Sequence, residues 1–344
     1  MRLNVHPFVL PLASPFRVVH ESRTEQPTVI VELNDPTTGL SGYGEAPQTR
    51  YYGLDPAASL ATLQNLAPAF APLAELAPEA LHVLLDREAP ALHPFLRCAL
   101  DAATHDLWAR KQGMRLGELW GQPARLTPTC YTIGMGSIAE MREKLRAFPW
   151  PVYKIKLGGD TDDLAVITAL RELTAAPFYV DANTGWTAEQ TIALAPRLRD
   201  LGVVFIEQPL PPDDRNGQLR VYAESVLPVI ADESCQTEAD IDACAGLFHG
   251  VNIKVVKCGG LLPARRMIGR ARQLGMSVMV GCMTESSVGI SAIAQLLPEL
   301  DYADMDGAML LAEDPARGVA FDAATGLVRY PPGPGTGVTL TGMG

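Results

Sequence analysis

The segment Tyr153-Lys154-Ile155-Lys156 is one of five short apolar runs that each end in a charged side chain. The five runs are Val152–Lys156, Phe178–Asp181, Val203–Glu207, Val229–Asp232 and Val251–Lys254. Their final charges recur at intervals of 25, 26, 25 and 22 residues, about the length of one strand followed by one helix. Each charge is therefore expected at the carboxyl end of a successive parallel strand, which is where a β/α barrel keeps its chemistry.

Three further apolar segments extend this series to a closed set of eight strands. They are Leu126–Ile133, Ser277–Gly281 and Tyr302–Asp306. Helical spacing fills the gaps, over Ile138–Ala147, Asp162–Leu173, Ala188–Leu201, Leu219–Val226, Glu238–Cys244, Pro263–Leu274 and Val288–Leu297. The pattern predicts an α/β fold with one (β/α)₈ barrel over residues 123–320. It does not predict a solenoid, because the repeat stops where a barrel would close.

The segment before the barrel, residues 1–122, predicts an α+β capping domain. Residues 1–46 alternate like strands, most clearly at Val29–Leu33 and Ser41–Glu45, and predict a small antiparallel meander. Helical spacing follows over Pro56–Gly113.

Two polar loops and the tail complete the predicted organisation. The loops Ala13–Gln26 and Pro47–Asp55 are expected to interrupt the meander and to form a lid over the site. The tail, residues 321–344, is rich in Gly and Pro and is expected to pack back on the capping domain or the barrel as an irregular strand or two.

Composition excludes several classes of function. The net charge of −11 and the pI near 5.1 argue against a nucleic-acid partner, since phosphate contacts need clustered Lys and Arg. No apolar run approaches the 18 residues or so of a membrane span. The six cysteines form no C-x-x-C pair, and the start of the chain lacks the apolar core of a secretory signal. We therefore expect a cytoplasmic protein that acts on a small molecule.

The predicted ring places the five charges around one site. Counting Leu126–Ile133 as strand one, the lysines lie on strands two and six, which face each other across the mouth. Asp181, Glu207 and Asp232 lie between them along one wall. Three converging carboxylates would take up protons unless a cation held them, and ligation by oxygen alone favours Mg²⁺ before Mn²⁺ or Ca²⁺. The alternative is that these acids only form structural salt bridges.

The other charged residues refine this reading. None of the six histidines lies at these strand ends, which argues against zinc. Lys154 and Lys156 share one face of their strand, so one can contact a charged group of the substrate while the other faces its acidic carbon. A neighbouring lysine and a metal are expected to lower the pKa of such a base from about 10.4 toward roughly 7–8.

Several motifs resemble the enolase superfamily, and within it the muconate-lactonizing subgroup. They are Lys154-Ile155-Lys156, Val180-Asp181-Ala182-Asn183-Thr184-Gly185-Trp186, Phe205-Ile206-Glu207-Gln208-Pro209-Leu210, Ala231-Asp232-Glu233-Ser234, Asn252-Ile253-Lys254 with Cys258-Gly259-Gly260, and Gly42-Tyr43-Gly44-Glu45-Ala46-Pro47. The likeness spans nearly the whole chain. Enolase-superfamily sites pair a Lys or His base with Mg²⁺ and form an ene-diolate.

The resemblance implies a role for each site residue. Asp181, Glu207 and Asp232 would bind Mg²⁺, which would hold the substrate carboxylate and stabilise the enediolate. Lys156 and Lys254 would be the two acid/base catalysts, and Lys154 would bind the carboxylate. Mandelate racemase relatives place a His on strand seven, whereas here that strand runs into Cys282-Met283-Thr284, so the His-dependent branch is disfavoured.

Strand eight indicates the substrate class. Asp304 and Asp306 resemble the pair with which dipeptide epimerases bind the α-ammonium of the substrate, and they are expected to lie far from the metal. Thr132, Cys282 and Thr284 match further substrate-contacting positions. The resemblance thus implies a Mg²⁺-dependent epimerase that inverts the α-carbon of the second residue of an L-Ala-D/L-Glu-like dipeptide.

Other readings stay open. An o-succinylbenzoate synthase, an N-acylamino acid racemase or a muconate-type cycloisomerase would share every metal and lysine residue, and a non-catalytic binding barrel would need no acid/base pair. Side-chain specificity is also open, because Glu21 stands where Ala-Glu epimerases have an Arg, with Arg17 and Arg23 nearby. The sequence leaves the oligomeric state undecided, a homo-oligomer included.

Overall fold

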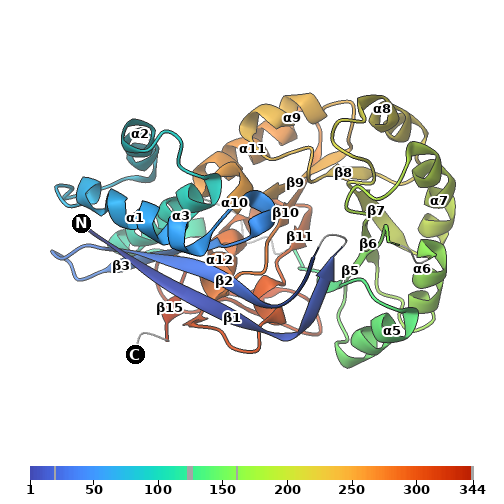
Figure 1. Cartoon of the computed structure of the whole chain (residues 1–344), viewed down its shortest axis with the longest axis horizontal. Helices are drawn as coiled ribbons and strands as arrows, with labels where there is room; N and C mark the ends of the chain where they lie inside the picture. Colours follow the sequence, from blue (N-terminus) through green and yellow to red (C-terminus); the bar gives the residue numbers. More distant parts are fainter. Residues whose placement is uncertain (19–20, 122–126, 160–161, 342–344) are drawn as a thin grey trace.

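A computed structural model describes residues 1–18, 21–121, 127–159 and 162–341. It contains a barrel of parallel strands ringed by helices, and against it a layer of long antiparallel strands and helices built from the start of the chain (Figure 1). Strand β15 (Thr339–Leu340), near the end of the chain, lies on the same side of the molecule as this layer (Figure 1).

The barrel has eight parallel strands, each hydrogen-bonded to the next in chain order. They are β4 (Tyr131–Ile133), β5 (Tyr153–Lys156), β6 (Phe178–Asp181), β7 (Val203–Glu207), β8 (Val229–Ala231), β9 (Gly250–Lys254), β10 (Ser277–Gly281) and β11 (Tyr302–Asp304). A parallel bridge between Thr129 and Ala303 joins the first and last strand regions. The predicted (β/α)₈ fold is confirmed. Its first strand begins later than expected, after Pro128, and Leu126 lies outside the described residues.

Helices follow the strands around the barrel. They are α5 (Ile138–Ala147), α6 (Asp163–Arg171), α7 (Ala188–Asp200), α8 (Arg215–Glu224), α9 (Glu238–Cys244), α10 (Val255–Cys258), α11 (Leu261–Gln273) and α12 (Ser287–Ile293), with 3₁₀ turns η2 (Ala294–Glu299) and η3 (Gly307–Leu310). Local capping fixes several starts. In α5, for example, Ser137 and Glu140 form a capping box. Helix α8 begins earlier than predicted, because Asp214 Oδ1 accepts a hydrogen bond from Gly217 N at 2.9 Å.

The inside of the barrel has an apolar layer below a charged one. The lower layer consists of Cys130, Val152, Tyr179, Phe205, Ile230 and Met279. The rings of Tyr179 and Phe205 stack with centroids 4.4 Å apart. Side chains of a strand alternate in direction, so the residues two positions further on also point inward. Those residues include Lys154, Asp181, Glu207 and Asp232, so the charged site has an apolar floor.

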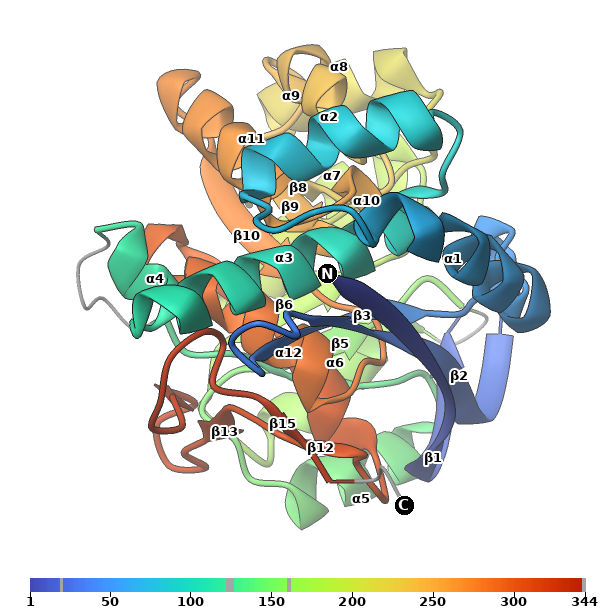
Figure 2. The same cartoon turned by 90° about the vertical axis from the view of Figure 1, so that its left-hand side faces the viewer.

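The capping layer is a three-stranded antiparallel sheet with helices on one face. Its elements are β1 (Arg2–Val18), β2 (Glu21–Asn34), β3 (Ser41–Pro47), η1 (Arg50–Tyr52), α1 (Pro56–Phe70), α2 (Pro78–Glu88), α3 (Pro94–Gln112) and α4 (Leu116–Leu119). Helix α3 lies centrally (Figure 2), in contact with β3 of the sheet and with α10 and α11 of the barrel. It therefore connects the two parts of the molecule.

The prediction of a loop over Ala13–Gln26 is wrong. Strands β1 and β2 continue through it as one hairpin, in which Phe16 pairs with Arg23. The register shifts between Pro11 and Phe16, so the irregular Pro- and Ser-containing segment is absorbed as a bulge. The facing strand satisfies the backbone groups that a loop would have left to water.

The tail after the barrel forms two short strand pairs. Strand β12 (Ala316–Arg317) pairs with β15 (Thr339–Leu340), and β13 (Ala320–Phe321) pairs with β14 (Val328–Arg329). The tail also contacts α3, where Asp106 Oδ1 accepts a hydrogen bond from Thr336 N at 2.7 Å. The predicted domain boundary at residues 122–123 falls outside the described residues and stays a prediction.

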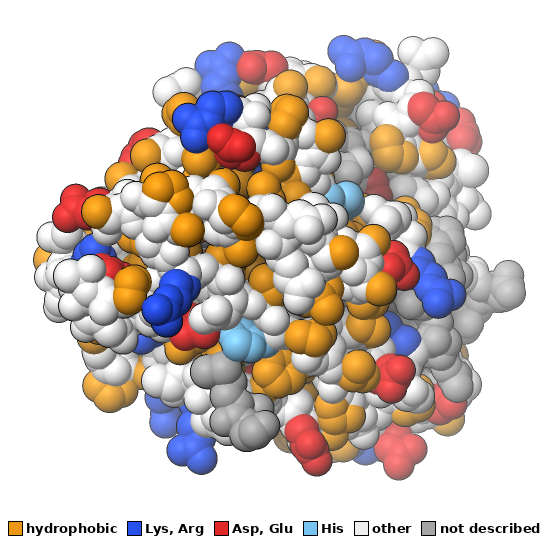
Figure 3. Space-filling model, turned by 60° about the vertical axis from the view of Figure 1, so that its left-hand side comes forward, with side chains coloured by type: hydrophobic (Ala, Val, Ile, Leu, Met, Phe, Trp, Pro, Cys, Tyr) orange, Lys and Arg blue, Asp and Glu red, His pale blue; other side chains and the backbone are white. Residues whose placement is uncertain are grey.

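The surface charge and the character of the helices can be compared with the expectations from composition. On the face shown in Figure 3, acidic and basic side chains are interspersed and form no basic patch. Among the helices of the described residues, none has the length and apolar character needed to cross a membrane.

Strand β3 lies so close to α3 that only glycine fits at Gly44. A Cβ at this position would lie 2.0 Å from Ala99 O and 2.8 Å from Ala103 N. We expect Gly44→Ala to lower the free energy of unfolding by about 1–3 kcal/mol, the usual cost of overpacking. Urea denaturation measures this change. Gly269→Ala is the matched control, because a Cβ in that exposed part of α11 meets nothing within 4 Å. It should be neutral or stabilising, and equal effects of the two substitutions would contradict the account.

Candidate active site

A cavity of about 480 Å³ opens at the carboxyl ends of the barrel strands. Its walls come from both parts of the molecule. The barrel contributes Thr132, Lys154, Lys156, Asn183, Asp232, Glu233, Lys254, Cys282, Met283, Thr284, Asp304, Asp306 and Leu310. The capping domain contributes Phe16, Arg23, Gln26, Pro47, Thr49, Arg50, Tyr51 and Tyr52. The two segments predicted to form a lid therefore both reach the cavity.

Lys154 forms the centre of a buried ionic network. Its side chain is 1% exposed, and its Nζ lies 3.0 Å from Asp181 Oδ2, 2.8 Å from Glu207 Oε2 and 2.8 Å from Asp304 Oδ2. Lys156 Nζ reaches the same Asp181 oxygen at 2.7 Å, as expected for two lysines on one face of a strand. The Lys156 side chain is 11% exposed, so it faces the cavity.

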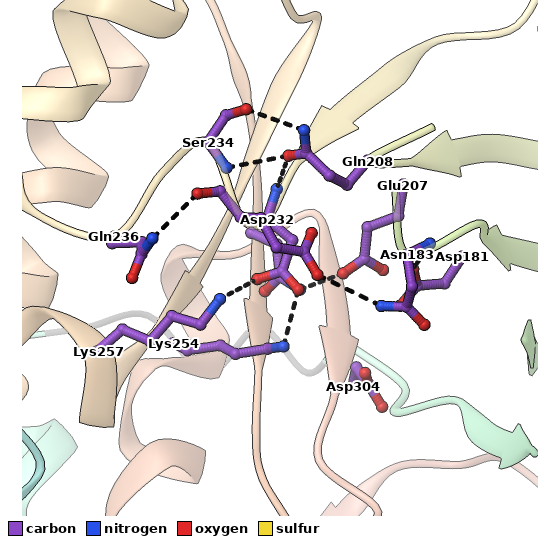
Figure 4. Close-up of polar contacts among 12 residues, drawn as sticks. Asp181, Asn183, Glu207, Gln208, Asp232, Ser234, Gln236, Lys254, Lys257 and Asp304 are labelled. Atoms are coloured by element: carbon purple, nitrogen blue, oxygen red, sulfur yellow. Dashed lines mark hydrogen bonds and ion pairs between the residues drawn. The ribbon is translucent and has the colours of Figure 1, made fainter. Parts of the chain in front are cut away.

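Two further lysines hold Asp232 from the other side of the site. Lys254 Nζ donates to Asp232 Oδ2 at 2.9 Å, and Lys257 Nζ donates to Oδ1 at 2.8 Å. Figure 4 shows both ammonium groups approaching this carboxylate from the same direction. Lys254 is 10% exposed and Lys257 only 1%. Lys254 is therefore the member of this pair that a ligand in the cavity can reach.

Lys156 and Lys254 stand on opposite sides of the barrel. Strands β5 and β9 are separated by three strands, β6 to β8, on one side of the ring. On the other side β10, β11 and β4 separate them. The structure thus places the two predicted acid/base groups on opposite strands of the barrel, with Asp181 and Glu207 beside Lys154 and with Asp232 beside Lys254.

The backbone is strained directly after two of the acidic residues. Asn183 and Thr184 have φ angles of 42° and 66°, and Gln208 has a φ of 34°. Non-glycine residues in this region cost free energy and concentrate at functional sites. Here the strain turns side chains toward the site. Asn183 Oδ1 accepts a hydrogen bond from Lys156 Nζ at 3.2 Å. Gln208 Oε1 accepts one from Asp232 N at 2.9 Å, which ties the ends of β7 and β8 together (Figure 4).

The carboxylates of the site raise the pKa of two buried lysines, whereas the predicted lowering depends on a bound cation and stays a prediction. Burial opposes the charged form of Lys154, but Asp181, Asp304 and Glu207 outweigh it and raise its pKa well above the usual value. Burial likewise opposes the charge on Lys254, whereas Asp232 raises its pKa. Without a cation, the excess of carboxylates makes an ammonium favourable.

The carboxylates divide into strongly and weakly ionised groups. Burial disfavours the charge on Asp181, but Lys154 and Lys156 lower its pKa below the usual range. Asp232 is lowered in the same way by Lys254 and Lys257. For Glu207, burial and the neighbouring Asp181 raise the pKa instead. Glu207 is therefore the acid of the three that most lacks positive charge.

The donors present fit a hard divalent cation. Asp181, Glu207 and Asp232 offer only oxygen, the ligand atom that Mg²⁺ prefers. Glu207 Oε2 is buried and accepts no hydrogen bond from any described residue. Lys154 Nζ is close to it at 2.8 Å, but it lies off the hydrogen-bonding direction. Among described residues the three acids do not bring three ligand atoms within 4.8 Å of one another, and the Lys154 ammonium contacts two of them.

Asp304 and Asp306 differ in their surroundings. Asp304 is paired with Lys154, so it lies close to the predicted metal ligands, and the expectation of a distant pair is wrong for Asp304. The reason is that opposite strands of the barrel meet at its narrow axis. Asp306 Oδ2 accepts a hydrogen bond from Thr132 N at 2.6 Å. Burial and then the charge of Asp304 raise the pKa of Asp306 to about 7.

The remaining predicted residues lie around these two acids. Cys282, Asp304 and Asp306 bring potential ligand atoms within 4.8 Å of one another. Thr284 Oγ1 accepts a hydrogen bond from Arg23 Nη2 at 2.8 Å, so the hairpin of the capping domain touches the loop after β10. The side chains of Arg17, His20 and Glu21 lie outside the described residues.

Three residues of the site were not predicted from the sequence. Lys257 follows Lys254 by three residues, and this spacing on the short helix α10 would have placed it beside the site. Asn252 precedes Lys254 by two residues and shares its face of β9. Its Nδ2 donates to Glu207 Oε1 at 2.7 Å. Glu45, in the capping domain, accepts hydrogen bonds from Ser286 N at 3.0 Å and Gly289 N at 3.0 Å. It thereby positions the segment that follows Thr284.

Comparison with known proteins identifies similar chains. Residues 137–343 match the family model described as enolase C-terminal domain-like, and residues 3–121 match the N-terminal domain of mandelate racemase / muconate lactonizing enzyme. An L-Ala-D/L-amino acid epimerase from Maribacter sp. (strain HTCC2170 / KCCM 42371) is 47% identical, with 99% of each chain covered.

Two solved structures are similar along their whole length. The substrate-liganded complex of the L-Ala-D/L-Glu epimerase from Bacillus subtilis has a TM-score of 0.90 and 26% identity, and 98% of each chain is covered. A dipeptide epimerase from Methylococcus capsulatus, complexed with Mg and the dipeptide L-Arg-D-Lys, has a TM-score of 0.86 and 33% identity. Here 98% of this chain and 99% of that chain are covered.

Proposed function

The chain belongs to the mandelate racemase and muconate lactonizing enzyme family, with an enolase-like C-terminal domain, and we propose that it is a Mg²⁺-dependent dipeptide epimerase. The observation that carries the proposal is the placement of Lys156 and Lys254 on opposite strands of one cavity, each beside a carboxylate. With one acid/base group on each face of an α-carbon, one group can remove the proton and the other can return a proton to the opposite face.

Each side of the cavity has a proposed task. Asp181, Glu207 and Asp232 would hold Mg²⁺, which would supply positive charge near the substrate carboxylate and make the α-proton more acidic. Lys154 lies at the floor, beside two of these acids, and assists in binding the carboxylate. Lys156 and Lys254 act on the second residue of the dipeptide. One removes the α-proton, and the other returns a proton to the opposite face.

The far end of the cavity recognises the first residue. Asp306 is buried, and among the described residues no lysine forms with it an ion pair like that between Lys154 and Asp304. It is therefore the acid that we expect to bind the α-ammonium group of the substrate, with Asp304 as the second partner. Thr132, Cys282 and Thr284 line the cavity around it. Asp304 is 6% exposed and Asp306 is 3% exposed, so an ammonium group there would be desolvated and its ionic contacts strengthened.

One observation favours an N-acylamino acid racemase instead. The ion pair between Lys154 and Asp304 neutralises one of the two acids. An uncharged acyl group is therefore less unfavourable at this end of the cavity than it would be beside two charged carboxylates. The carboxylate of Asp306, by contrast, favours a positively charged α-ammonium group over an uncharged acyl group. The two readings differ in whether a free α-ammonium is required, and this difference can be measured directly.

Incubation of L,L-dipeptides with the protein, Mg²⁺ and D₂O tests the proposal. We expect the dipeptide to gain one deuteron, which mass spectrometry measures, and the L,D-diastereomer to appear, which chiral chromatography measures. N-acetyl and N-succinyl amino acids serve as matched substrates without an α-ammonium. Exchange confined to these acylated compounds would refute the epimerase reading and support the racemase. The rates of α-proton exchange across the dipeptides rank the preferred side chains of the second residue. Arg23 contributes to this specificity from the cavity wall.

The pH dependence of catalysis should report on Asp306. The ionised form attracts the α-ammonium, whereas the protonated form does not. Because the pKa of Asp306 is about 7, we expect kcat/KM to fall about tenfold per pH unit below 7. It should also fall above about 8, where the amino group of a dipeptide loses its proton.

A substitution separates Asp306 from other groups that titrate nearby. Glu233, which also lines the cavity, has its pKa raised to about 7 by burial and by Asp232. Asp306→Asn should raise KM about 10- to 150-fold, the loss of a charged hydrogen bond, and should remove the acid limb of the profile. An unchanged acid limb in this variant would show that another group is responsible.

The proposal also includes the cellular compartment and the partner of the protein. All six cysteines lie in the described residues and are free thiols, four of them buried, which supports the reducing cytoplasm as the site of action. A dipeptide is the proposed partner, and no nucleic acid or membrane enters the mechanism.

A further inference from the structure

A second cavity of about 420 Å³ lies beside the active-site cavity. Phe16, Thr132 and Leu310 line both cavities and form the wall between them. The second cavity extends over β4 and α5, and we call it the β4–α5 cavity. Its apolar lining residues include Tyr131, Met135, Met141, Ala147 and Phe148.

The shared wall is built around Asp306. Thr132 N donates to Asp306 Oδ2 at 2.6 Å, so β4 is attached to this carboxylate. The 3₁₀ turn η3 begins at Gly307, directly after Asp306, and ends at Leu310. Thr132 is therefore held by the acid that is proposed to bind the substrate's α-ammonium, and Leu310 lies at the end of the turn that follows this acid.

This geometry determines where the first side chain of a dipeptide begins. The α-carbon that carries the ammonium group also carries the first side chain. With the ammonium on Asp306, that side chain starts at the wall formed by Thr132 and Leu310. Because both cavities share Phe16, Thr132 and Leu310 as lining residues, a long side chain that runs along these residues would reach the β4–α5 cavity, whereas the methyl group of alanine would not.

The chemistry of the β4–α5 cavity suits an apolar or aromatic group. The rings of Tyr131 and Phe148 stack with centroids 4.2 Å apart and planes 10° apart. Phe148 is 37% exposed, so a side chain in the cavity would cover apolar surface that now meets water. Three charged residues, Glu140, Glu143 and Lys144, also line the cavity, and Glu140 already accepts hydrogen bonds from Ser137 N at 2.8 Å and Ser137 Oγ at 2.9 Å.

We propose that the β4–α5 cavity is a subsite for the first residue of the dipeptide and that it takes large apolar or aromatic side chains. The inference rests on the proposed epimerase function and narrows it. It predicts a substrate range broader than the first-position alanine named for the Maribacter relative.

A matched set of dipeptides tests the subsite. L-Ala-L-Ala, L-Leu-L-Ala, L-Phe-L-Ala and L-Lys-L-Ala differ only in the first residue. We expect kcat/KM for the Leu and Phe substrates to be at least about one tenth of that for L-Ala-L-Ala, a difference no larger than one methylene can make in an apolar pocket. The Lys substrate should fall more than about tenfold below L-Ala-L-Ala, because its ammonium group would lose water beside the apolar lining. Leu and Phe substrates more than tenfold below L-Ala-L-Ala would overturn the proposal.

Filling the cavity provides the second arm of the test. Ala147 lies at the end of α5 and lines the β4–α5 cavity. Ala147→Phe should lower the ratio of kcat/KM for L-Phe-L-Ala over L-Ala-L-Ala at least about tenfold, and Ala147→Leu should give an intermediate ratio. Ala223→Phe, on the exposed side of α8, is the control that should leave the ratio unchanged. An unchanged ratio in both Ala147 variants would also overturn the subsite. Absence of exchange with every dipeptide would instead refute the epimerase function itself.

Discussion

Lys156→Ala and Lys254→Ala should each reduce epimerisation by at least about 10³-fold, within the range expected for loss of a general acid or base. Both side chains are partly exposed to the cavity, at 11% and 10%, whereas Lys154 is 1% exposed. They also lie on opposite strands, so neither can replace the other at the same face of the α-carbon. Chiral chromatography of the dipeptide after incubation measures the loss.

The two variants should differ in how they exchange the α-proton. Each retains one lysine, which still removes the proton from the stereoisomer that presents it to that side. We expect Lys156→Ala to incorporate solvent deuterium into one diastereomer and Lys254→Ala into the other, without inversion. Lys111→Ala is the matched control, because Lys111 pairs with Asp35 at 2.8 Å in the capping domain. Full inversion by either single variant would contradict a mechanism with two bases.

Glu207→Gln should abolish activity by weakening Mg²⁺ binding. The variant keeps a side-chain oxygen that can accept the hydrogen bond from Asn252 but removes one of three negative charges. Charge on the ligands is the main attraction for Mg²⁺, so we expect the dissociation constant to rise at least about 100-fold, as when a ligand environment is disrupted. Isothermal titration calorimetry of the metal-free protein measures it, with the exposed Glu224→Gln as control.

Proton release is a readout of the same site that does not depend on turnover. The carboxylates around Lys154 and Lys254 raise the pKa of both lysines and so keep them protonated. A divalent cation on these acids removes the cause of that stabilisation, so Mg²⁺ binding at neutral pH should release protons. The heat of binding should therefore depend on the ionisation enthalpy of the buffer. Binding by Glu207→Gln with wild-type affinity and proton release would contradict the assignment of Glu207 as a ligand.

The barrel could be predicted because its strands end in a simple signal. Strands β6 and β7 have the predicted bounds, Phe178–Asp181 and Val203–Glu207, since each apolar run stops at an inward-pointing acid. Helices α5 and α9 also match, because Ser137 and Thr237 begin capping boxes. In these elements the local pattern and the tertiary structure agree.

Other features depend on contacts that a linear pattern does not contain. The segment Ala13–Gln26 has the turn-forming residues of a loop, but pairing between its two halves makes it a hairpin. The raised pKa of Lys254 follows from the carboxylate it meets, Asp232, which is 22 residues away. The Lys154–Asp304 ion pair joins residues on strands that are distant in sequence and close in the barrel.

The position of deuterium in a single dipeptide tests the central claim most directly. We expect L-Ala-L-Ala, incubated with the protein and Mg²⁺ in D₂O, to gain one deuteron at the α-carbon of the second residue and none at the first, with conversion to the L,D-diastereomer. Nuclear magnetic resonance of the two α-positions distinguishes these outcomes. Deuterium at the first residue, or inversion without exchange, would contradict proton transfer between Lys156 and Lys254.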